Sequence, residues 1–157
     1  MDLSKYSHAS TGSLLCAGCG IPADAEYFDV SDLKEAPLVG RAVVLAAFTL
    51  PPQYCGVLQY FSQYTDLFAK SSAEVDTPGL VWTIRSNGRP LYPYIDLKRI
   101  VNPWGFGSFP VAIRLDDNAA IEFIIRNIDD SKQSIKRVGG RILGRYWYNA
   151  AYGDVAR

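Results

Sequence analysis

Two cysteines separated by two residues, Cys16 and Cys19, form the only motif of this sequence that is typical of a chemical site. Such a pair is half of a tetrahedral zinc site, which needs four nitrogen or sulfur ligands. The chain offers only His8 and Cys55 to complete it, so a second matching pair is missing. A thioredoxin-like role needs the pair between a strand and a helix, which the flanking residues do not predict. We interpret Cys16 and Cys19 as small residues in a turn, with zinc binding and redox chemistry as alternatives.

Acid–base catalysis has few candidates in this chain. His8 is the sole histidine, so a general base would have to be a carboxylate. The adjacent pairs Asp116-Asp117 and Asp129-Asp130 fall where turns are expected, and Asp in a turn usually hydrogen-bonds the nearby backbone. Calcium binding at Asp116, Asp117 and Asn118 is an alternative, although the spacing matches no calcium-loop signature. We therefore expect no enzyme and no cofactor.

Composition narrows the class of protein and its partners. The 157 residues are about the length of one domain, and hydrophobic residues make up 48%. Sixteen basic and sixteen acidic residues cancel, which argues against nucleic acid as a partner. No stretch reaches the ~20 apolar residues that span a membrane. The odd number of cysteines argues against a disulfide framework, and the N-terminus does not read as a signal peptide, so we expect a cytoplasmic product.

Any site must be positioned by strands, because short alternating segments follow one another from residue 39 onward. Asn87-Gly88 predicts a tight hairpin after one of them, and Gly139-Gly140 permits a bulge in the last. The pattern predicts an all-β protein, an antiparallel β-sandwich of jelly-roll type. The expected strands are residues 41–50, 55–65, 80–85, 111–115, 120–126 and 138–148.

The N-terminal region has a different character, rich in Ser, Gly, Ala and Asp. We divide the chain into an extended or loop-rich arm, residues 1–38, and a sandwich domain, residues 39–157. Within the arm, the segment from Asp29 to Glu35 predicts one short helical turn with Ser31 as its N-cap. We expect the arm to order against its own domain or a neighbouring subunit.

The last expected strand, residues 138–148, carries large side chains on both of its faces. Arg141, Leu143, Arg145 and Trp147 share one face by alternation, and the other face carries Ile142, Gly144, Tyr146 and Tyr148. Arginine and tryptophan are enriched at interface anchors, so we interpret the first face as a subunit interface. Trp104 and Phe106, in an aromatic loop, are further candidates for it. Ordinary core or surface, and carbohydrate stacking, are the alternatives.

The segments IRLDDNAAIEFIIRN and VGGRILGRYWYNAAYGD together resemble small β-sandwich structural proteins of tailed-phage virions. The resemblance covers residues 39–153 and is one of pattern. It implies a non-enzymatic virion protein, assembled in the host cytoplasm, whose arm reaches a neighbour and whose body forms a homo-oligomer, with a trimer favoured. The implied role is capsid decoration on the major capsid protein or another virion protein. A head-to-tail connector, collar or tail protein is the alternative. A glycan-binding sandwich using Trp104, Phe106 and Tyr94 is a further one.

Overall fold

The chain folds into two antiparallel four-stranded sheets in this computed structural model, which describes residues 20–66, 79–97, 108–129 and 135–149. The described residues contain no helix, so the prediction of an all-β sandwich is confirmed. The strands are β1 (Glu26–Glu35), β2 (Ala42–Thr49), β3 (Tyr54–Thr65), β4 (Leu80–Ser86), β5 (Arg89–Pro90), β6 (Ser108–Leu115), β7 (Ala120–Asn127) and β8 (Arg137–Tyr148).

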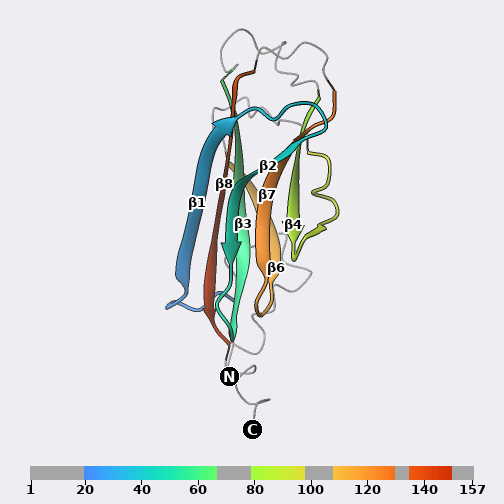
Figure 1. Ribbon diagram of the computed structural model, residues 1–157. Helices are drawn as coiled ribbons and strands as arrows, with labels where there is room; N and C mark the ends of the chain where they lie inside the picture. The colour runs from blue at the N-terminus through green and yellow to red at the C-terminus, as the bar shows by residue number, and fades with distance from the viewer. Residues whose placement is uncertain (1–19, 67–78, 98–107, 130–134, 150–157) are drawn as a thin grey trace.

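The strand order is that of a jelly roll. Sheet A has the order β1-β8-β3-β6 and sheet B the order β2-β7-β4-β5. Within them β1 pairs with β8, β2 with β7, β3 with β6 and β4 with β5, which is the pattern of one long hairpin rolled into two layers. The β3–β8 and β4–β7 pairings complete the two sheets. In Figure 1, β2 and β7 lie in front of β8 and β3. The predicted jelly-roll character is confirmed.

The main core lies between the two sheets. Alternate residues of each strand point into it, because successive side chains of a strand leave opposite faces. Phe123 of β7 and Trp82 of β4 are its largest fully buried side chains from sheet B, and Ile142 of β8 faces them from sheet A. This layer holds the two sheets together and leaves the opposite side of each sheet turned outward.

The bulge of sheet A is not where we expected it. The register of β8 with both neighbours runs unbroken through Gly139 and Gly140. The register shift falls in β3, between Leu58 and Tyr60. Gly140 serves close packing instead, because a Cβ there would lie 2.7 Å from Cδ1 of Phe123 in the opposite sheet.

The predicted turns are confirmed where they are described. Asn87 and Gly88 connect β4 to β5 with positive φ angles of 51° and 75°. Such angles suit the tight turn that Asn-Gly favours. The return strand β5 has only two residues, as the proline at its end leads one to expect. Asn118, in the turn between β6 and β7, also has a positive φ, of 55°.

The N-terminal region departs from the expected division at residue 38. Residues 26–35 form β1, which pairs along its whole length with β8 as an edge strand of sheet A. The helical turn predicted from Asp29 to Glu35 is therefore wrong. A capping signal is local and weak, and ten residues of pairing to β8 override it. Residues 1–19 of the expected arm lie outside the described residues.

Candidate interaction face

The predicted interface residues of the last strand lie on one side of sheet A, the side turned away from sheet B. We call this side the outer face. β1 and β3 flank β8, so their outward side chains surround those of β8. The outer face presents Arg141, Leu143, Arg145 and Trp147 of β8, Tyr27, Asp29, Ser31 and Leu33 of β1, and Cys55, Val57, Tyr60, Ser62 and Tyr64 of β3. The shared face predicted by alternation is confirmed, and its role as an interface stays a prediction.

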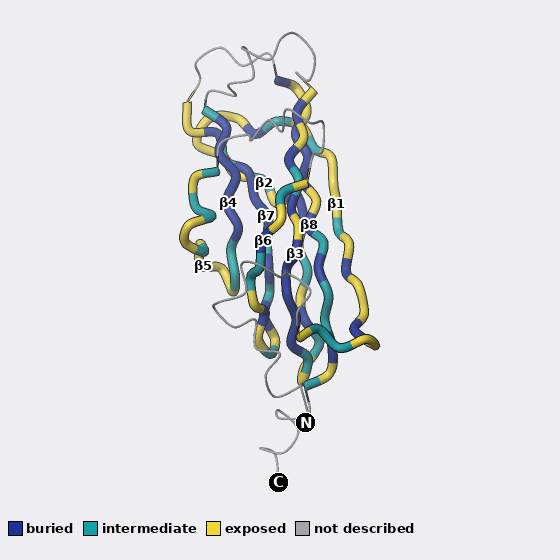
Figure 2. The backbone as a smooth tube through the Cα atoms, turned by 180° about the vertical axis from the view of Figure 1, so that it is seen from behind, coloured by how far each residue is buried: buried dark blue, intermediate teal, exposed yellow. Residues whose placement is uncertain are grey.

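Residues 20–25, which we call the cover segment, close the part of the outer face nearest Trp147. They precede β1 and cross the lower end of the sheet in the view of Figure 2. Ile21 and Ala25 pack on Cys55, Val57 and Trp147 in an apolar cluster separate from the main core. Trp147 is only 6% exposed, so its own chain occupies this predicted interface residue.

Arg145 ties the cover segment to the sheet. Its Nη2 donates a hydrogen bond to the carbonyl oxygen of Ala25 at 3.0 Å, and its guanidinium carbon lies 4.6 Å from the ring centre of Tyr27. Burying Ala25 and part of Ile21 contributes only about 1–2 kcal/mol. Fixing each backbone residue costs about as much, roughly 1–2 kcal/mol. The cover segment is therefore held more weakly than the strands beneath it.

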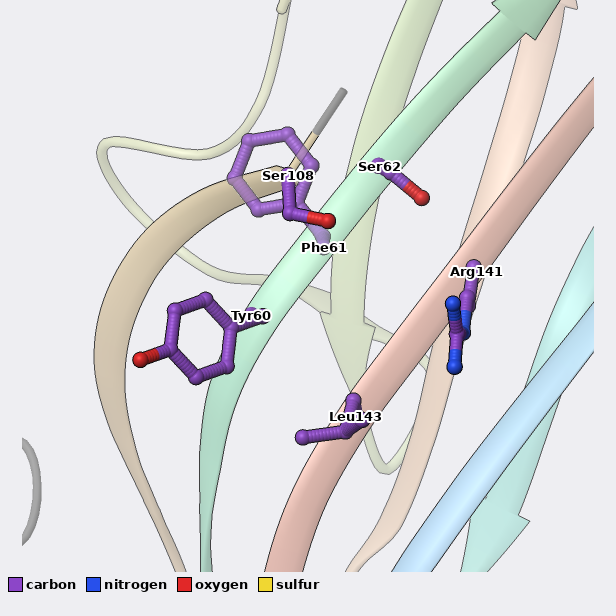
Figure 3. A pocket seen from close by; sticks show the side chains of 6 residues that line it. All are labelled: Tyr60, Phe61, Ser62, Ser108, Arg141 and Leu143. Carbon is purple, nitrogen blue, oxygen red and sulfur yellow. The ribbon is translucent and has the colours of Figure 1, made fainter. Parts of the chain in front are cut away.

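Two shallow grooves occupy the rest of the outer face, which we call the open half. One has a volume of about 270 Å³ and is lined by Tyr60, Phe61, Ser62, Ser108, Arg141 and Leu143. Figure 3 shows Tyr60 and Ser62 on β3, beside Arg141 and Leu143 on β8. The other has a volume of about 390 Å³ and is lined by Ser31, Asp32, Leu33, Ser62, Tyr64, Gly139, Gly140 and Arg141. Ser62 and Arg141 line both, so the grooves adjoin.

Large apolar side chains are exposed around these grooves. Tyr60 is 40%, Tyr64 41% and Leu33 47% exposed. Gly139 lies between the last two, since a Cβ there would be 3.2 Å from Cβ of Tyr64 and 3.3 Å from Cδ1 of Leu33. Because Gly139 has no side chain, the groove is deeper at this position. Clustered apolar side chains with a polar surround mark interaction sites on soluble proteins.

An ion pair stands beside Leu143 in the open half. Nε of Arg141 donates to Oδ1 of Asp29 at 2.7 Å, and Nη2 donates to Oδ2 of the same carboxylate. These hydrogen bonds lower the pKa of Asp29. The side chains of Arg141 and Asp29 are 49% and 42% exposed, so the pair is in contact with solvent. It therefore adds little to the stability of the fold and mainly fixes the positions of the two side chains. It adds no net charge to the face, which keeps the open half compatible with an uncharged or self-complementary partner.

Four predicted site residues lie outside the described residues: Cys16, Cys19, Trp104 and Phe106. Tyr94, proposed with the last two as a glycan platform, packs partly buried against the main core. Part of its side chain is therefore covered by the main core.

The acidic turn is used structurally. Oδ1 of Asp117 accepts a hydrogen bond from the backbone nitrogen of Gln53 at 2.6 Å, and Asp116 pairs with Arg114 at 2.5 Å. Within the described ranges, no three His, Cys, Asp or Glu side chains gather as a metal site would require. Burial raises the pKa of the Cys55 thiol to about 11, which makes it a poor nucleophile.

The comparisons with known proteins leave the outer face as the main guide to function. No protein-family model matches the chain, and no curated protein matches it in sequence. In the part of the chain that the structure describes, we also find no helix of the length and apolarity needed to cross a membrane.

The contribution of β1 and β3 to this face was not predicted from the sequence. Tyr60, Ser62 and Tyr64 alternate along β3, and this spacing was a usable signal once β3 was recognised as a strand. Tyr27 and Leu33 had no such signal, because their segment was assigned to the arm. Only the pairing of β1 with β8 brings them beside Arg145 and Gly139.

Proposed function

We propose that this protein is a non-enzymatic structural subunit that works by association through the outer face of sheet A. The observation that carries the proposal is the open half of that face. There Leu33, Tyr60 and Tyr64 are exposed around two adjoining grooves, on a rigid four-stranded sheet. Aromatic and aliphatic side chains with a neutral, paired charge at their centre are typical of a protein–protein contact.

The assembly we propose is a tailed-phage virion, with capsid decoration as the role. Two arguments support it. The sequence pattern of residues 39–153 resembles virion sandwich proteins, and the jelly-roll strand order is one that capsid proteins use. Both are arguments by analogy, since one fold hosts many functions. The proposed partners are further copies of this chain, in a trimer, and the major capsid protein.

The proposed role does not require catalytic groups, and several described polar residues have structural partners. Arg141 and Arg114 are each engaged by a neighbouring aspartate, and the carboxylates of the acidic turn serve the backbone or an arginine. The buried thiol of Cys55 has a raised pKa. The ion pairs and hydrogen bonds of these groups hold surface side chains and turns in place.

Sedimentation velocity over a range of concentrations tests the association. The wild-type chain is expected to form an oligomer, and Leu143→Asp is expected to shift it to monomer, because a carboxylate in the apolar groove loses its hydration on contact. Ala42→Asp is the matched control: Ala42 is exposed on sheet B and pairs with Arg126, so it leaves association unchanged. A monomer at all concentrations, or equal loss in both variants, would contradict the proposal.

Quantitative mass spectrometry of gradient-purified virions tests the role in the particle. Decoration predicts a copy number comparable with that of the major capsid protein. A few copies per particle would move the protein to the neck or tail, which is the alternative role. Its absence from particles would overturn the virion assignment while leaving the association measurement intact.

A further inference from the structure

The apolar surface of the outer face continues beneath the cover segment. On β3, Val57 is followed by Tyr60, and on β8, Trp147 is followed by Leu143 with Arg145 between them. Among the described residues, Val57 and Trp147 cluster with Cys55 on the sheet and with Ile21 and Ala25 of the cover segment. We call the part of the outer face beneath the cover segment the covered half. Without residues 20–25, the covered half and the open half would form one continuous surface across sheet A.

The open half is small for a lasting contact between two proteins. It runs along β8 from Gly139 to Leu143, about 13 Å at the rise of a strand, and four strands are about 19 Å across. The product is roughly 250 Å² in projection, well below the ~800 Å² that each partner of a stable complex buries. The stretch from Leu143 to Trp147 is equally long, so uncovering it doubles the projected contact to roughly 500 Å², which is closer to that size.

The covered half also holds the residue best suited to anchor an interface. Tryptophan is among the residues most enriched at binding hot spots, and Trp147 sits on a rigid central strand. The only described hydrogen bond that we find between the cover segment and the sheet is the one from Arg145 to Ala25. The segment lies outside the strands, since β1 begins at Glu26.

We propose that residues 20–25 are a displaceable cover, and that a second copy of this chain takes their place on Cys55, Val57 and Trp147 during association. This inference rests on the proposed function. The first contact uses the exposed grooves, and displacement of the cover then extends the same interface over the whole outer face. A second copy fits because Asp29 and Arg141 pair at the centre of the outer face, so two identical faces meet there without a net repulsion between like charges.

The reactivity of the Cys55 thiol measures how often the cover segment is open. Cys55 is 7% exposed and lies against Ala25 in the cluster beneath the segment. Replacing Cys16 and Cys19 by serine leaves Cys55 as the only thiol of the full chain. The rate of its reaction with a maleimide at low protein concentration then follows the population of the open cover.

Two variants loosen the cover at different ends of its contact. Ile21→Ser acts within the cover segment, and Arg145→Gln removes its tie to the sheet. Each is expected to label Cys55 about fivefold faster and to raise the association constant by a similar factor, since a larger fraction of molecules is then competent to associate. Arg126→Gln is the control on sheet B, where the arginine pairs with Asp96 and, among the described residues, makes no hydrogen bond or ion pair with the cover segment.

The outcomes separate this inference from the proposed function. Faster labelling together with tighter association in both loosened variants supports the displaceable cover. Faster labelling with unchanged or weaker association overturns it, because the cover would then be only a structural patch. If the wild-type chain itself never associates, the proposed function fails first and the interface role of the covered half fails with it.

Discussion

The outer face of sheet A has two halves that share the same strands and differ in what lies over them. Around Trp147, residues 20–25 close the surface, and the tryptophan is 6% exposed. Around Arg141, grooves of about 270 and 390 Å³ lie between exposed tyrosines and Leu33. Alternation along β8 therefore decides which way a side chain points. A segment from another part of the chain decides whether that side chain is core or surface.

We expect the largest loss of stability from a substitution of Gly144, where strands β8 and β3 lie close together. A Cβ at Gly144 would lie 2.2 Å from the carbonyl oxygen of Val57 and 2.4 Å from Cζ of Phe28, so strands β8 and β3 would have to move apart. We expect Gly144→Ala to lower the free energy of unfolding by more than about 3 kcal/mol. Urea unfolding followed by tryptophan fluorescence measures this loss.

Gly139→Ala is the matched control for that substitution. It adds the same methyl group to the same strand, but on the open half, where the closest neighbours would be 3.2–3.3 Å away. We expect a loss of about 1 kcal/mol or less. Equal losses in the two variants would mean that the open groove is as tightly packed as the interior, which contradicts the contrast between them.

The next largest effect is the difference between the losses of stability caused by truncating a side chain in each half of the outer face. Trp147→Ala empties the apolar cluster beneath the cover segment and is expected to cost about 3 kcal/mol of stability. Leu143→Ala, four residues away in the open half, is expected to cost less than about 1 kcal/mol, because its side chain is already partly solvated. Similar costs for both, measured by urea unfolding, would show that the halves are equally covered.

The smallest effect concerns the ion pair of the open half. Because the pKa of Asp29 is lowered in the folded state, its contribution to stability is present above the unfolded-state value of 3.8. That contribution is lost as the pH falls through the lower folded-state value. Asp29→Asn should therefore show a small loss of stability at pH 7 that becomes smaller as the pH falls below 3.8, in urea unfolding over a series of pH values. Asp24→Asn, at an exposed aspartate, is the control; a deficit for Asp29→Asn that stays constant or grows on acidification would contradict the account.

Much of this architecture was predictable from local pattern. The alternation of Ile121, Phe123 and Ile125 identified a core strand, and Asn87-Gly88 identified its neighbouring hairpin, because both signals depend on a few adjacent residues. β1 was not predictable in this way. Its residues have little apolar alternation, and only pairing to β8, over one hundred residues away in sequence, makes them a strand.

The candidate site was predictable in part for the same reason. Alternation placed Arg141, Leu143, Arg145 and Trp147 on one face correctly. It could not show that Trp147 is covered by residues 20–25, or that Asp29 pairs with Arg141, since both contacts join distant segments. The shift of register in β3 also redirects Tyr60 and Tyr64, and no residue type marks that position in advance.

Hydroxyl-radical footprinting of the wild-type chain tests the central claim most directly, because the tyrosines report on different surfaces at once. The protein is labelled at concentrations below and above its association transition, and each tyrosine is quantified by mass spectrometry. We predict that Tyr60 and Tyr64 lose reactivity on association, whereas Tyr92, which is 87% exposed outside sheet A, keeps its reactivity. Unchanged Tyr60 and Tyr64 beside a protected Tyr92 would place the contact elsewhere and contradict the account.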